Sequence, residues 1–299
     1  MIIVRAKKLG MCMGVKRALE LAAKAGEACA AKGKKVLSYG PLIHNPQATA
    51  RLQEKGVGIL DARAFDSGDL GEEARDAIIV IRAHGAPPQV FSRLATLGAE
   101  IVDATCPRVL RSQQKARELA ARGYRIIIAG DGEHAEVAGL VGQVPAAFVV
   151  QDEEEAKDFF DRNPGLERQK LAILAQSTIQ KTEYTAITKA LAERAKECVA
   201  LDTLCPASAE RQAALVDLAG HVSAIVVVGG KNSANTQRLA SAARAAGKPC
   251  WHIETAAELP PEVFSFDKIG LTAGASTPDF MVDEVESFLM KGASNGSSP

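Results

Sequence analysis

The stretch Glu100-Ile-Val-Asp-Ala-Thr-Cys106-Pro107 decides the fold predicted for this chain. It reads as a short apolar strand that ends in a cysteine, and the charged segment after it has helical periodicity. Similar phrases end at Cys12 and at Cys205. Three strand–cysteine–helix phrases at near-equal spacing indicate three copies of one unit, each supplying a sulfur to a common centre. The three helices predicted after the cysteines span residues 15–32, 108–122 and 207–219.

Strands alternate with helices along the rest of the chain. Several strands are apolar without alternation, such as Arg125-Ile-Ile-Ile-Ala-Gly130 and Ala224-Ile-Val-Val-Val-Gly229. This pattern is typical of parallel sheets that are buried on both faces, so the predicted fold class is α/β with mainly parallel sheets. In such sheets ligands bind beyond the carboxyl ends of the strands. The three cysteines fall at those ends.

The repeats predict three α/β units, at residues 14–104, 105–203 and 204–291. The third unit lacks a closing strand, whereas residues 1–13 contain a strand with no helix before it. We therefore expect the N-terminal strand to complete the third sheet and to close a pseudo-threefold ring around the common site. Residues 292–299 are rich in Gly, Ser and Asn and are expected to form a disordered tail.

Composition narrows the class of protein. Lysine plus arginine equals aspartate plus glutamate, 36 each, which argues against a nucleic-acid or membrane-surface partner. No apolar run approaches the roughly 20 residues of a membrane span, and the start Met1-Ile-Ile-Val-Arg5 is too short for the apolar region of a signal peptide. We expect a cytoplasmic protein, in which the cysteines are thiols or metal ligands rather than disulfides.

The cysteines divide into two groups. Those that end strands at equivalent repeat positions are candidate metal ligands: Cys12, Cys106 and Cys205. The others read as small packing residues: Cys29, Cys198 and Cys250. A thiolate at the start of a helix is favoured by the positive end of the helix dipole. Three thiolates suit an iron–sulfur cluster or zinc, and three ligands on a four-iron cube would leave one iron open as a Lewis acid.

Polar strand ends supply a candidate anion site. His44, His84 and His134 follow predicted strands, and histidines beside free backbone N–H groups suit phosphate. The segments Asn232-Ser233-Ala234-Asn235 and Ser276-Thr277 open two further helices. Their side chains can cap those helices and bind an anion at once.

Glu136 stands in the first turn of a predicted helix, close to His134. A carboxylate there commonly compensates the helix dipole. Beside an anion site its charge would repel the ligand, so the position fits better with a proton donor to an uncharged part of the substrate.

These residues together resemble the LytB family, the 4-hydroxy-3-methylbut-2-enyl diphosphate reductases that end the non-mevalonate isoprenoid pathway. The matching phrases run in the family order over all but the tail. They are Gly10-Met-Cys12-Met-Gly-Val15, His44-Asn45, Ala83-His84-Gly85, Asp103-Ala-Thr-Cys106-Pro107, His134-Ala-Glu136-Val137, Gln176-Ser-Thr178, Lys231-Asn-Ser-Ala-Asn235 and Thr272-Ala-Gly-Ala-Ser276.

The resemblance implies a [4Fe–4S] cluster with three cysteine ligands, here Cys12, Cys106 and Cys205, and one iron open for the substrate hydroxyl. Two electrons and two protons would then expel water and give isopentenyl and dimethylallyl diphosphates. Glu136, His134 and Ser177 would form the catalytic set. The substrate, an allylic diphosphate, would be bound by His44, His84, His134, Ser177, Thr178, Asn232, Ser233, Ala234, Asn235 and Ser276.

Three departures from the family pattern are visible. Ser177 stands where the family commonly has threonine; the hydroxyl is kept, but the methyl group that fixes its rotamer is lost. Ala234 replaces a serine or glycine, so any contact there must come from the backbone. Met11 and Met13 flank the first cysteine where phenylalanine and alanine are frequent. None of these removes a predicted ligand or the predicted acid.

Two other functions compete with the reductase. A non-enzymatic iron–sulfur redox sensor explains the cysteines but not Glu136 or the histidines. A zinc hydrolase of a phosphorylated substrate explains the anion site, yet three thiolates would make zinc a poor Lewis acid. For the reductase we expect a ferredoxin or flavodoxin as electron donor, and a monomer, because the site residues come from a single chain.

Overall fold

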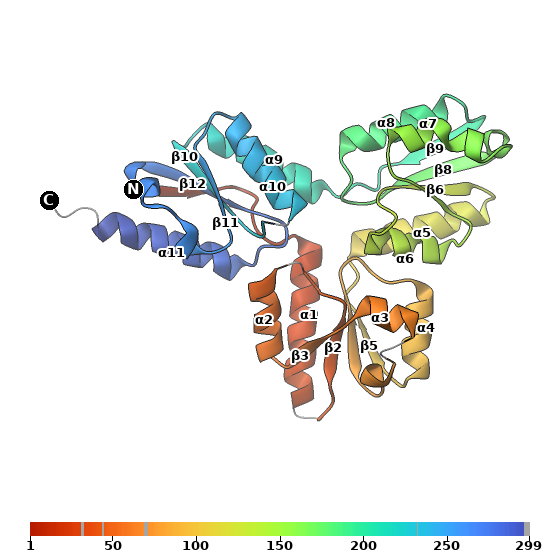
Figure 1. Cartoon of the computed structure of the whole chain (residues 1–299), viewed down its shortest axis with the longest axis horizontal. Coiled ribbons are helices and arrows are strands. Elements are labelled where there is room, and N and C mark those ends of the chain that lie inside the picture. Colours follow the sequence, from red (N-terminus) through yellow and green to blue (C-terminus); the bar gives the residue numbers. More distant parts are fainter. Residues whose placement is uncertain (31–32, 44, 69–70, 232, 296–299) are drawn as a thin grey trace. The chain divides into compact units, whose positions relative to one another are not determined.

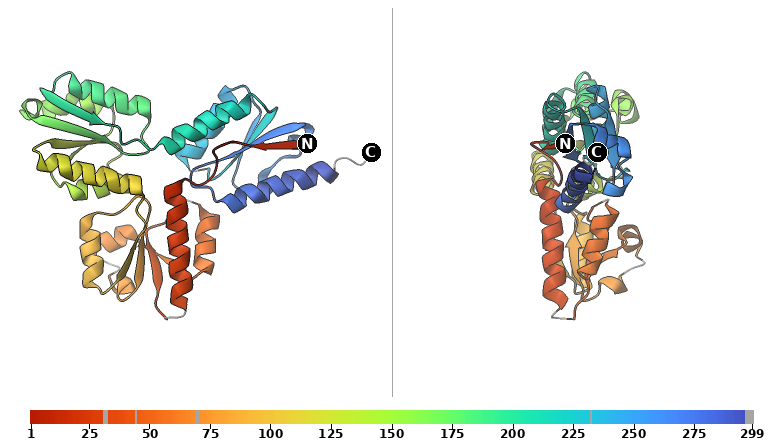
Figure 2. Two further views of the ribbon diagram at one scale, coloured as in Figure 1. Left: turned by 180° about the vertical axis from the view of Figure 1, so that it is seen from behind. Right: turned by 90° about the vertical axis from the view of Figure 1, so that its left-hand side faces the viewer.

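A computed structural model describes residues 1–30, 33–43, 45–68, 71–231 and 233–295. Three four-stranded sheets are formed within these ranges, and every strand pairing in them is parallel. Helices lie along both faces of each sheet (Figures 1 and 2). The expected α/β class with mainly parallel sheets is confirmed.

The first sheet has the order β3-β2-β4-β5. Its strands are β2 (Val36–Tyr39), β3 (Val57–Leu60), β4 (Ile78–Ile81) and β5 (Glu100–Asp103). Its helices are α1 (Met13–Ala30), α2 (Pro46–Glu54), α3 (Ala62–Ser67) and α4 (Pro88–Thr96), with a 3-10 turn at Glu72–Ala74. β4 is buried along its whole length because α1 and α2 contribute core residues on one side and α3 and α4 on the other.

The second sheet repeats this order as β7-β6-β8-β9. Its strands are β6 (Arg125–Ala129), β7 (Phe148–Val150), β8 (Lys170–Ala175) and β9 (Glu197–Leu201). Its helices are α5 (Pro107–Ala121), α6 (Ala135–Gln143), α7 (Glu153–Arg162) and α8 (Lys181–Ala192), with a 3-10 turn at Leu166–Arg168. α5 and α6 cover one face and α7 and α8 the other.

The third sheet has the order β1-β12-β10-β11. Its strands are β1 (Ile2–Arg5), β10 (Ala224–Val228), β11 (Cys250–Ile253) and β12 (Lys268–Ala273). Its helices are α9 (Pro206–Ala219), α10 (Ala234–Ala245) and α11 (Asp279–Asn295), with 3-10 turns at Ala256–Glu258 and Pro261–Ser265. β1 pairs with β12 in parallel, so the expected completion of the third sheet by the N-terminal strand is confirmed.

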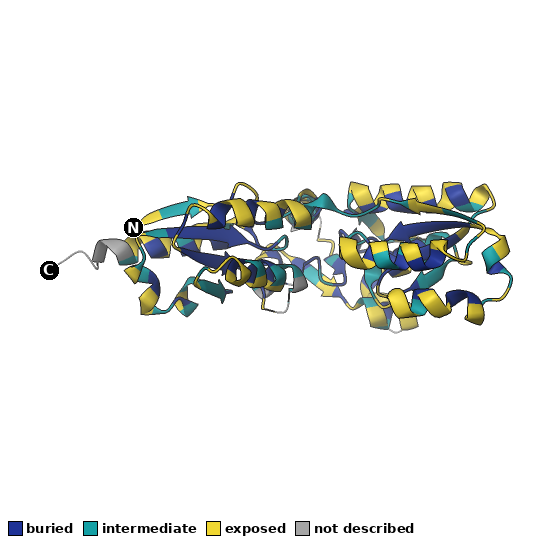
Figure 3. Ribbon diagram, turned by 90° about the horizontal axis from the view of Figure 1, so that it is seen from above, coloured by how far each residue is buried: buried dark blue, intermediate teal, exposed yellow. Residues whose placement is uncertain are grey.

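The three sheets share one connectivity. In each sheet, the first strand of the unit is an inner strand, the second strand lies at the edge beside it, and the last strand lies at the opposite edge. The last strands are β5, β9 and β1, and each is followed by a predicted ligand cysteine. The two inner strands of each sheet are mostly buried, whereas β1, β5 and β9 at the edges are not, and the helices expose their outer faces (Figure 3).

The described residues also form two compact parts, which cut across the three units. The first part contains Met1–Lys16, Ile43–Arg51 and Pro206–Pro299, and the second contains Arg17–Leu42 and Leu52–Cys205. The boundaries expected at residues 14–104, 105–203 and 204–291 stay predictions, as does the ring about a common centre. No helix in the described ranges is long and apolar enough to cross a membrane.

Some elements differ from the sequence expectation. The helix α7 was not among the elements predicted from the sequence; Asp152 caps it by accepting from Glu155 N, and Phe159 and Phe160 are buried in the core. The tail was expected to be disordered from Gly292, but α11 continues to Asn295. Gly292 lies against the Phe264 ring, so a tertiary contact outweighs the local composition. Residues 296–299 lie outside the described ranges.

A candidate active site

The loop before Cys106 is held on two sides. Asp103 ends β5, and its carboxylate accepts from the backbone N–H and the hydroxyl of Thr105. The Cys106 N–H donates to Ala83 O at 2.9 Å, directly before His84. Cys106 is the N-cap of α5, and Pro107 suits the first helical position, since its missing N–H would have no partner there. The thiol is free and half-buried, directly before the helix.

The loop before Cys205 is joined to the end of β8. The Thr203 hydroxyl accepts from Ala175 N at 2.7 Å and donates to Ala175 O at 2.9 Å. The Cys205 N–H donates to Ser177 O at 2.8 Å. The backbone of the predicted ligand Cys205 is therefore hydrogen-bonded to the backbone of the predicted catalytic residue Ser177.

The loop before Cys12 is joined to the loop after β12. Gly10 N donates to Ala273 O at 3.2 Å, and Cys12 N donates to Ala275 O at 3.0 Å. α1 begins at Met13, so Cys12, like the other two, immediately precedes a helix. Its thiol is also free and half-buried.

The donor set fits an iron–sulfur group chemically, since it consists of three half-buried cysteines that each stand directly before a helix. Cys12 belongs to the first compact part, and Cys106 and Cys205 belong to the second. Within the described ranges, no group of three His, Cys, Asp or Glu side chains is placed to hold a metal ion.

Cys198 and Cys250 are half-buried thiols whose pKa is raised by burial, which suits packing residues rather than thiolate ligands. Nothing is described for the side chain of Cys29.

Glu136 is fully buried in the first turn of α6. One carboxylate oxygen accepts from Ser177 N at 2.8 Å, and the other lies 2.7 Å from Ser177 Oγ. Burial raises the pKa of Glu136 because it disfavours the charged form, whereas the two Ser177 hydrogen bonds act against that rise. A carboxyl group with a raised pKa that is linked to a half-exposed hydroxyl can pass a proton to a ligand through that hydroxyl.

The Ser177 segment is fixed by its neighbours. Gln176 Oε1 accepts from Asp131 N and its Nε2 donates to Thr178 Oγ1, both at 2.9 Å. Gly130 makes this approach possible, because a Cβ there would lie 2.5 Å from Gln176 Oε1. The orientation of Ser177 toward Glu136 therefore depends on packing between the ends of β6 and β8.

His84 and His134 face each other with ring centroids 4.9 Å apart and planes at 62°. His134 caps α6, its Nδ1 accepting from Glu136 N at 3.2 Å. A ring nitrogen that accepts carries no hydrogen, so the neutral ring has its N–H on Nε2. His134 Nε2 is then a donor suited to a phosphate oxygen. These histidines come from the first and second sheets and lie in the same compact part as Glu136, Cys106 and Cys205.

The third sheet contributes a separate set of polar groups, all in the first compact part. Ser233 caps α10 by accepting from Thr236 N at 3.4 Å, and Ala234 begins that helix. Ser276 lies in the turn before α11, next to Thr277, whose buried hydroxyl donates to Val228 O at 3.1 Å. His44 and Asn232, also predicted to bind substrate, lie outside the described residues.

Three buried side-chain atoms of α10 and β12 have no hydrogen-bond partner among the described residues: Asn235 Nδ2, Thr236 Oγ1 and Thr272 Oγ1. A buried polar group without a partner costs free energy, so these atoms are suited to a ligand or an ordered water. Asn235 was predicted from the sequence. Thr236 and Thr272 were not, because threonine inside a helix or strand has no distinguishing sequence signal.

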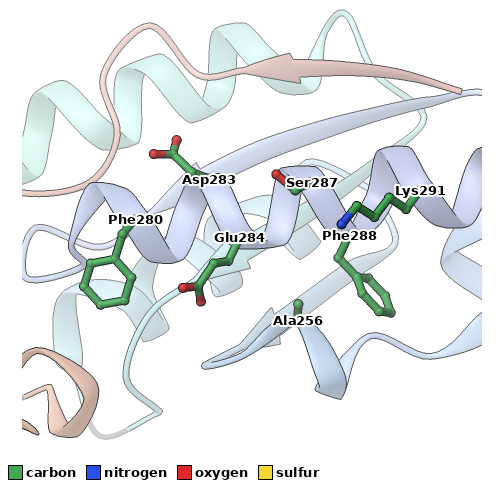
Figure 4. Close-up of a pocket in the computed structure, with 7 residues that line it drawn as sticks. All are labelled: Ala256, Phe280, Asp283, Glu284, Ser287, Phe288 and Lys291. Carbon is green, nitrogen blue, oxygen red and sulfur yellow. The ribbon is translucent and has the colours of Figure 1, made fainter. Parts of the chain in front are cut away.

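A pocket of about 480 Å³ lies beside α11 (Figure 4). Its lining residues are Ala256, Phe280, Asp283, Glu284, Ser287, Phe288 and Lys291. None of the predicted site residues lines it, so it takes no part in the chemistry considered below.

The family model described as LytB protein matches residues 3–290. The chain belongs to the LytB family. Among curated relatives, the 4-hydroxy-3-methylbut-2-enyl diphosphate reductase of Treponema denticola is 44% identical over 98% of this chain and 100% of its own length. The reductase of Anaeromyxobacter sp. strain Fw109-5 is 41% identical over 95% of each chain.

A solved structure agrees with this assignment. The (E)-4-hydroxy-3-methyl-but-2-enyl diphosphate reductase, described as the terminal enzyme of the non-mevalonate pathway, aligns with a TM-score of 0.79 and 33% identity over 97% of this chain and 100% of that one. The LytB resemblance inferred from the sequence phrases is therefore confirmed.

Proposed function

We propose that this chain reductively dehydroxylates 4-hydroxy-3-methylbut-2-enyl diphosphate to isopentenyl and dimethylallyl diphosphates. Two electrons and two protons enter, and the hydroxyl oxygen leaves as water. The full-length match to reductases of this name supports the activity. The observation on this chain that best fits it is the buried Glu136 carboxyl joined through both oxygens to Ser177. The relatives favour neither a redox sensor nor a zinc hydrolase.

LytB proteins are iron–sulfur enzymes. We propose that Cys12, Cys106 and Cys205 hold a [4Fe–4S] cluster as its only protein ligands, which leaves one iron open. When bound, such a cluster supplies electrons and a Lewis acid. The protein's part would be to supply three thiolate ligands, each directly before a helix.

Glu136 and Ser177 would deliver the proton that turns the leaving hydroxyl into water. Because burial raises the pKa of Glu136, its protonated form is favoured compared with an exposed glutamate. Ser177 Oγ can accept the Glu136 proton and donate its own toward the substrate, so the pair works as a relay. His134 would orient the first turn of α6 through its bond to Glu136 N and donate from Nε2.

The diphosphate would be bound by donors at the strand ends. The expected set includes His44, His84, His134, Ser177, Thr178, Asn232, Ser233, Asn235 and Ser276, together with the backbone N–H of Ala234. Among these, Asn235 Nδ2 is a buried donor without a partner in the described residues. A donor that binds the diphosphate would be unpartnered in this way before the substrate arrives. Free N–H groups at the start of α10 add to the attraction for phosphate.

An electron donor is needed for each turnover, and we expect a ferredoxin or flavodoxin. We expect the chain to act as a cytoplasmic monomer. Sedimentation of the iron-loaded protein tests the oligomeric state.

The deciding experiment is anaerobic purification followed by turnover of the diphosphate substrate with a chemically reduced viologen. Cys12→Ser, Cys106→Ser and Cys205→Ser should each lose iron and activity. Cys198→Ser and Cys250→Ser are the matched controls and should keep both. A colourless protein that contains zinc would overturn the proposal, as would an iron-loaded protein that does not turn the substrate over.

A further inference from the structure

Arg17 of α1 binds the loop that carries Cys106. Its Nη1 donates to Thr105 O at 3.2 Å, and its Nη2 donates to Asp103 O at 3.3 Å. Thr105 O and the Cys106 N–H belong to one peptide group, and that N–H donates to Ala83 O. The peptide group directly before the predicted ligand is therefore held at both ends.

Arg211 of α9 binds a backbone carbonyl of the loop that carries Cys12. Its Nε and Nη2 both donate to Gly10 O, at 3.0 and 2.6 Å, and its Nη1 donates to Ala207 O at 2.7 Å. The side chain is only 5% exposed. Gly10 has φ +68°, a left-handed conformation that glycine adopts without strain; because glycine also has more backbone freedom than other residues, the Arg211 contact restricts this turn. On its far side, Cys12 N is bound to Ala275 O.

We infer that Arg17 and Arg211 are positioning residues that fix the backbones of the Cys106 and Cys12 loops for cluster binding; the inference rests on the proposed function. Each arginine comes from a helix that starts directly after one predicted ligand, and it binds the loop before another. Arg17 follows Cys12 and supports Cys106, whereas Arg211 follows Cys205 and supports Cys12.

Arginine suits this role because its guanidinium is planar and carries five donors in a rigid fork, so it can bind two carbonyls, or one carbonyl twice, with little loss of side-chain entropy. Its positive charge also strengthens the hydrogen bonds that it donates. Lysine keeps the charge but not the fork, and glutamine keeps a donor but not the charge.

The test compares Arg17→Gln, Arg17→Lys, Arg211→Gln and Arg211→Lys with the wild type. Arg111→Gln is the matched control: Arg111 has the same offset from Cys106 that Arg17 has from Cys12, but its side chain is exposed. Two readouts are used. The first is hydrogen exchange of the metal-free full chain at residues 103–106 and 10–12. The second is iron bound per chain after anaerobic reconstitution.

We expect exchange at 103–106 to rise about tenfold in Arg17→Gln, since a hydrogen bond from a charged donor is lost. Exchange at 10–12 should rise similarly in Arg211→Gln. Iron content should fall by more than half in both glutamine variants. The iron content of the lysine variants should lie between that of the glutamine variants and that of the wild type. A general loss of stability would instead raise exchange throughout the chain.

Exchange at these loops equal to that of Arg111→Gln would overturn the inference, as would full iron loading in both glutamine variants. If wild type takes up no iron, the proposed cluster fails, whereas the exchange data still decide whether the arginines hold the loops. If the buried Arg211 variants do not fold, the half-buried Arg17 decides the outcome.

Discussion

At the residue scale, the Glu136–Ser177 pair gives the sharpest expectation. Glu136→Gln keeps the shape of the side chain and can still bond to Ser177, but it cannot release a proton. General acids typically contribute about 10²–10⁴-fold in rate. We expect kcat to fall by that factor with iron content and substrate affinity kept, as measured by steady-state kinetics and substrate titration. Near-normal kcat with a raised KM would make Glu136 a binding residue.

The same carboxyl should make stability depend on pH. Its folded-state pKa is raised above the ordinary value of 4.5, so the unfolded chain loses this proton at a lower pH than the folded chain does. The stability that this group contributes is present below pH 4.5 and is lost as the pH rises through the folded pKa. Urea unfolding from about pH 4 to about pH 8 should show wild type losing stability relative to Glu136→Gln. A difference that is independent of pH would contradict this.

The sequence alone predicted some residues of the candidate site and missed others, and the difference has a physical reason. The cysteines and Glu136 lie at strand ends and helix starts, which periodicity locates. Arg17 and Arg211 were missed because their partners are 88 and 201 residues away along the chain. On the printed sequence each is an ordinary charged residue of a predicted helix, and only the fold brings it to a carbonyl near a predicted ligand.

At the scale of elements, the ends of β6 and β8 determine where Ser177 lies. A Cβ at Gly130, whose φ is +157°, would lie 2.5 Å from Gln176 Oε1 and 2.6 Å from Gln176 Cβ. Gly130→Ala should therefore displace Gln176 and, with it, the Ser177 hydroxyl. We expect kcat to fall at least about tenfold, which corresponds to about 1.4 kcal/mol of lost transition-state stabilisation.

Gly123→Ala is the control for that change. Gly123 also has a positive φ, +83°, but nothing lies within 4 Å of an added Cβ. Backbone strain alone should cost stability, about 1–2 kcal/mol, and leave kcat unchanged. Equal kcat in the two variants would show that Gln176 does not position Ser177.

At the scale of the whole molecule, the sequence predicted the sheets better than the grouping of residues around them. Apolar strands and their spacing predicted three parallel sheets and the placement of β1 beside β12, both confirmed. The two compact parts were not predicted, because α1 and α2 each begin in one part and end in the other. Such a division depends on which side chains pack together over long sequence distances, and periodicity within a helix contains no information about that.

The N-terminal strand allows a test of how independent those parts are. Ile3 packs against the core of the third sheet, whereas its neighbour Ile2 is 61% exposed. Ile3→Asp would place a charge at a partly buried position without a partner, so we expect a loss of about 1–3 kcal/mol, while Ile2→Asp should cost little. Hydrogen exchange should rise in β10 and β12 of Ile3→Asp and stay at the wild-type level in β6 and β8, which belong to the other part. Equal loss of protection in β6 and β8 would mean that the two parts unfold as one cooperative unit.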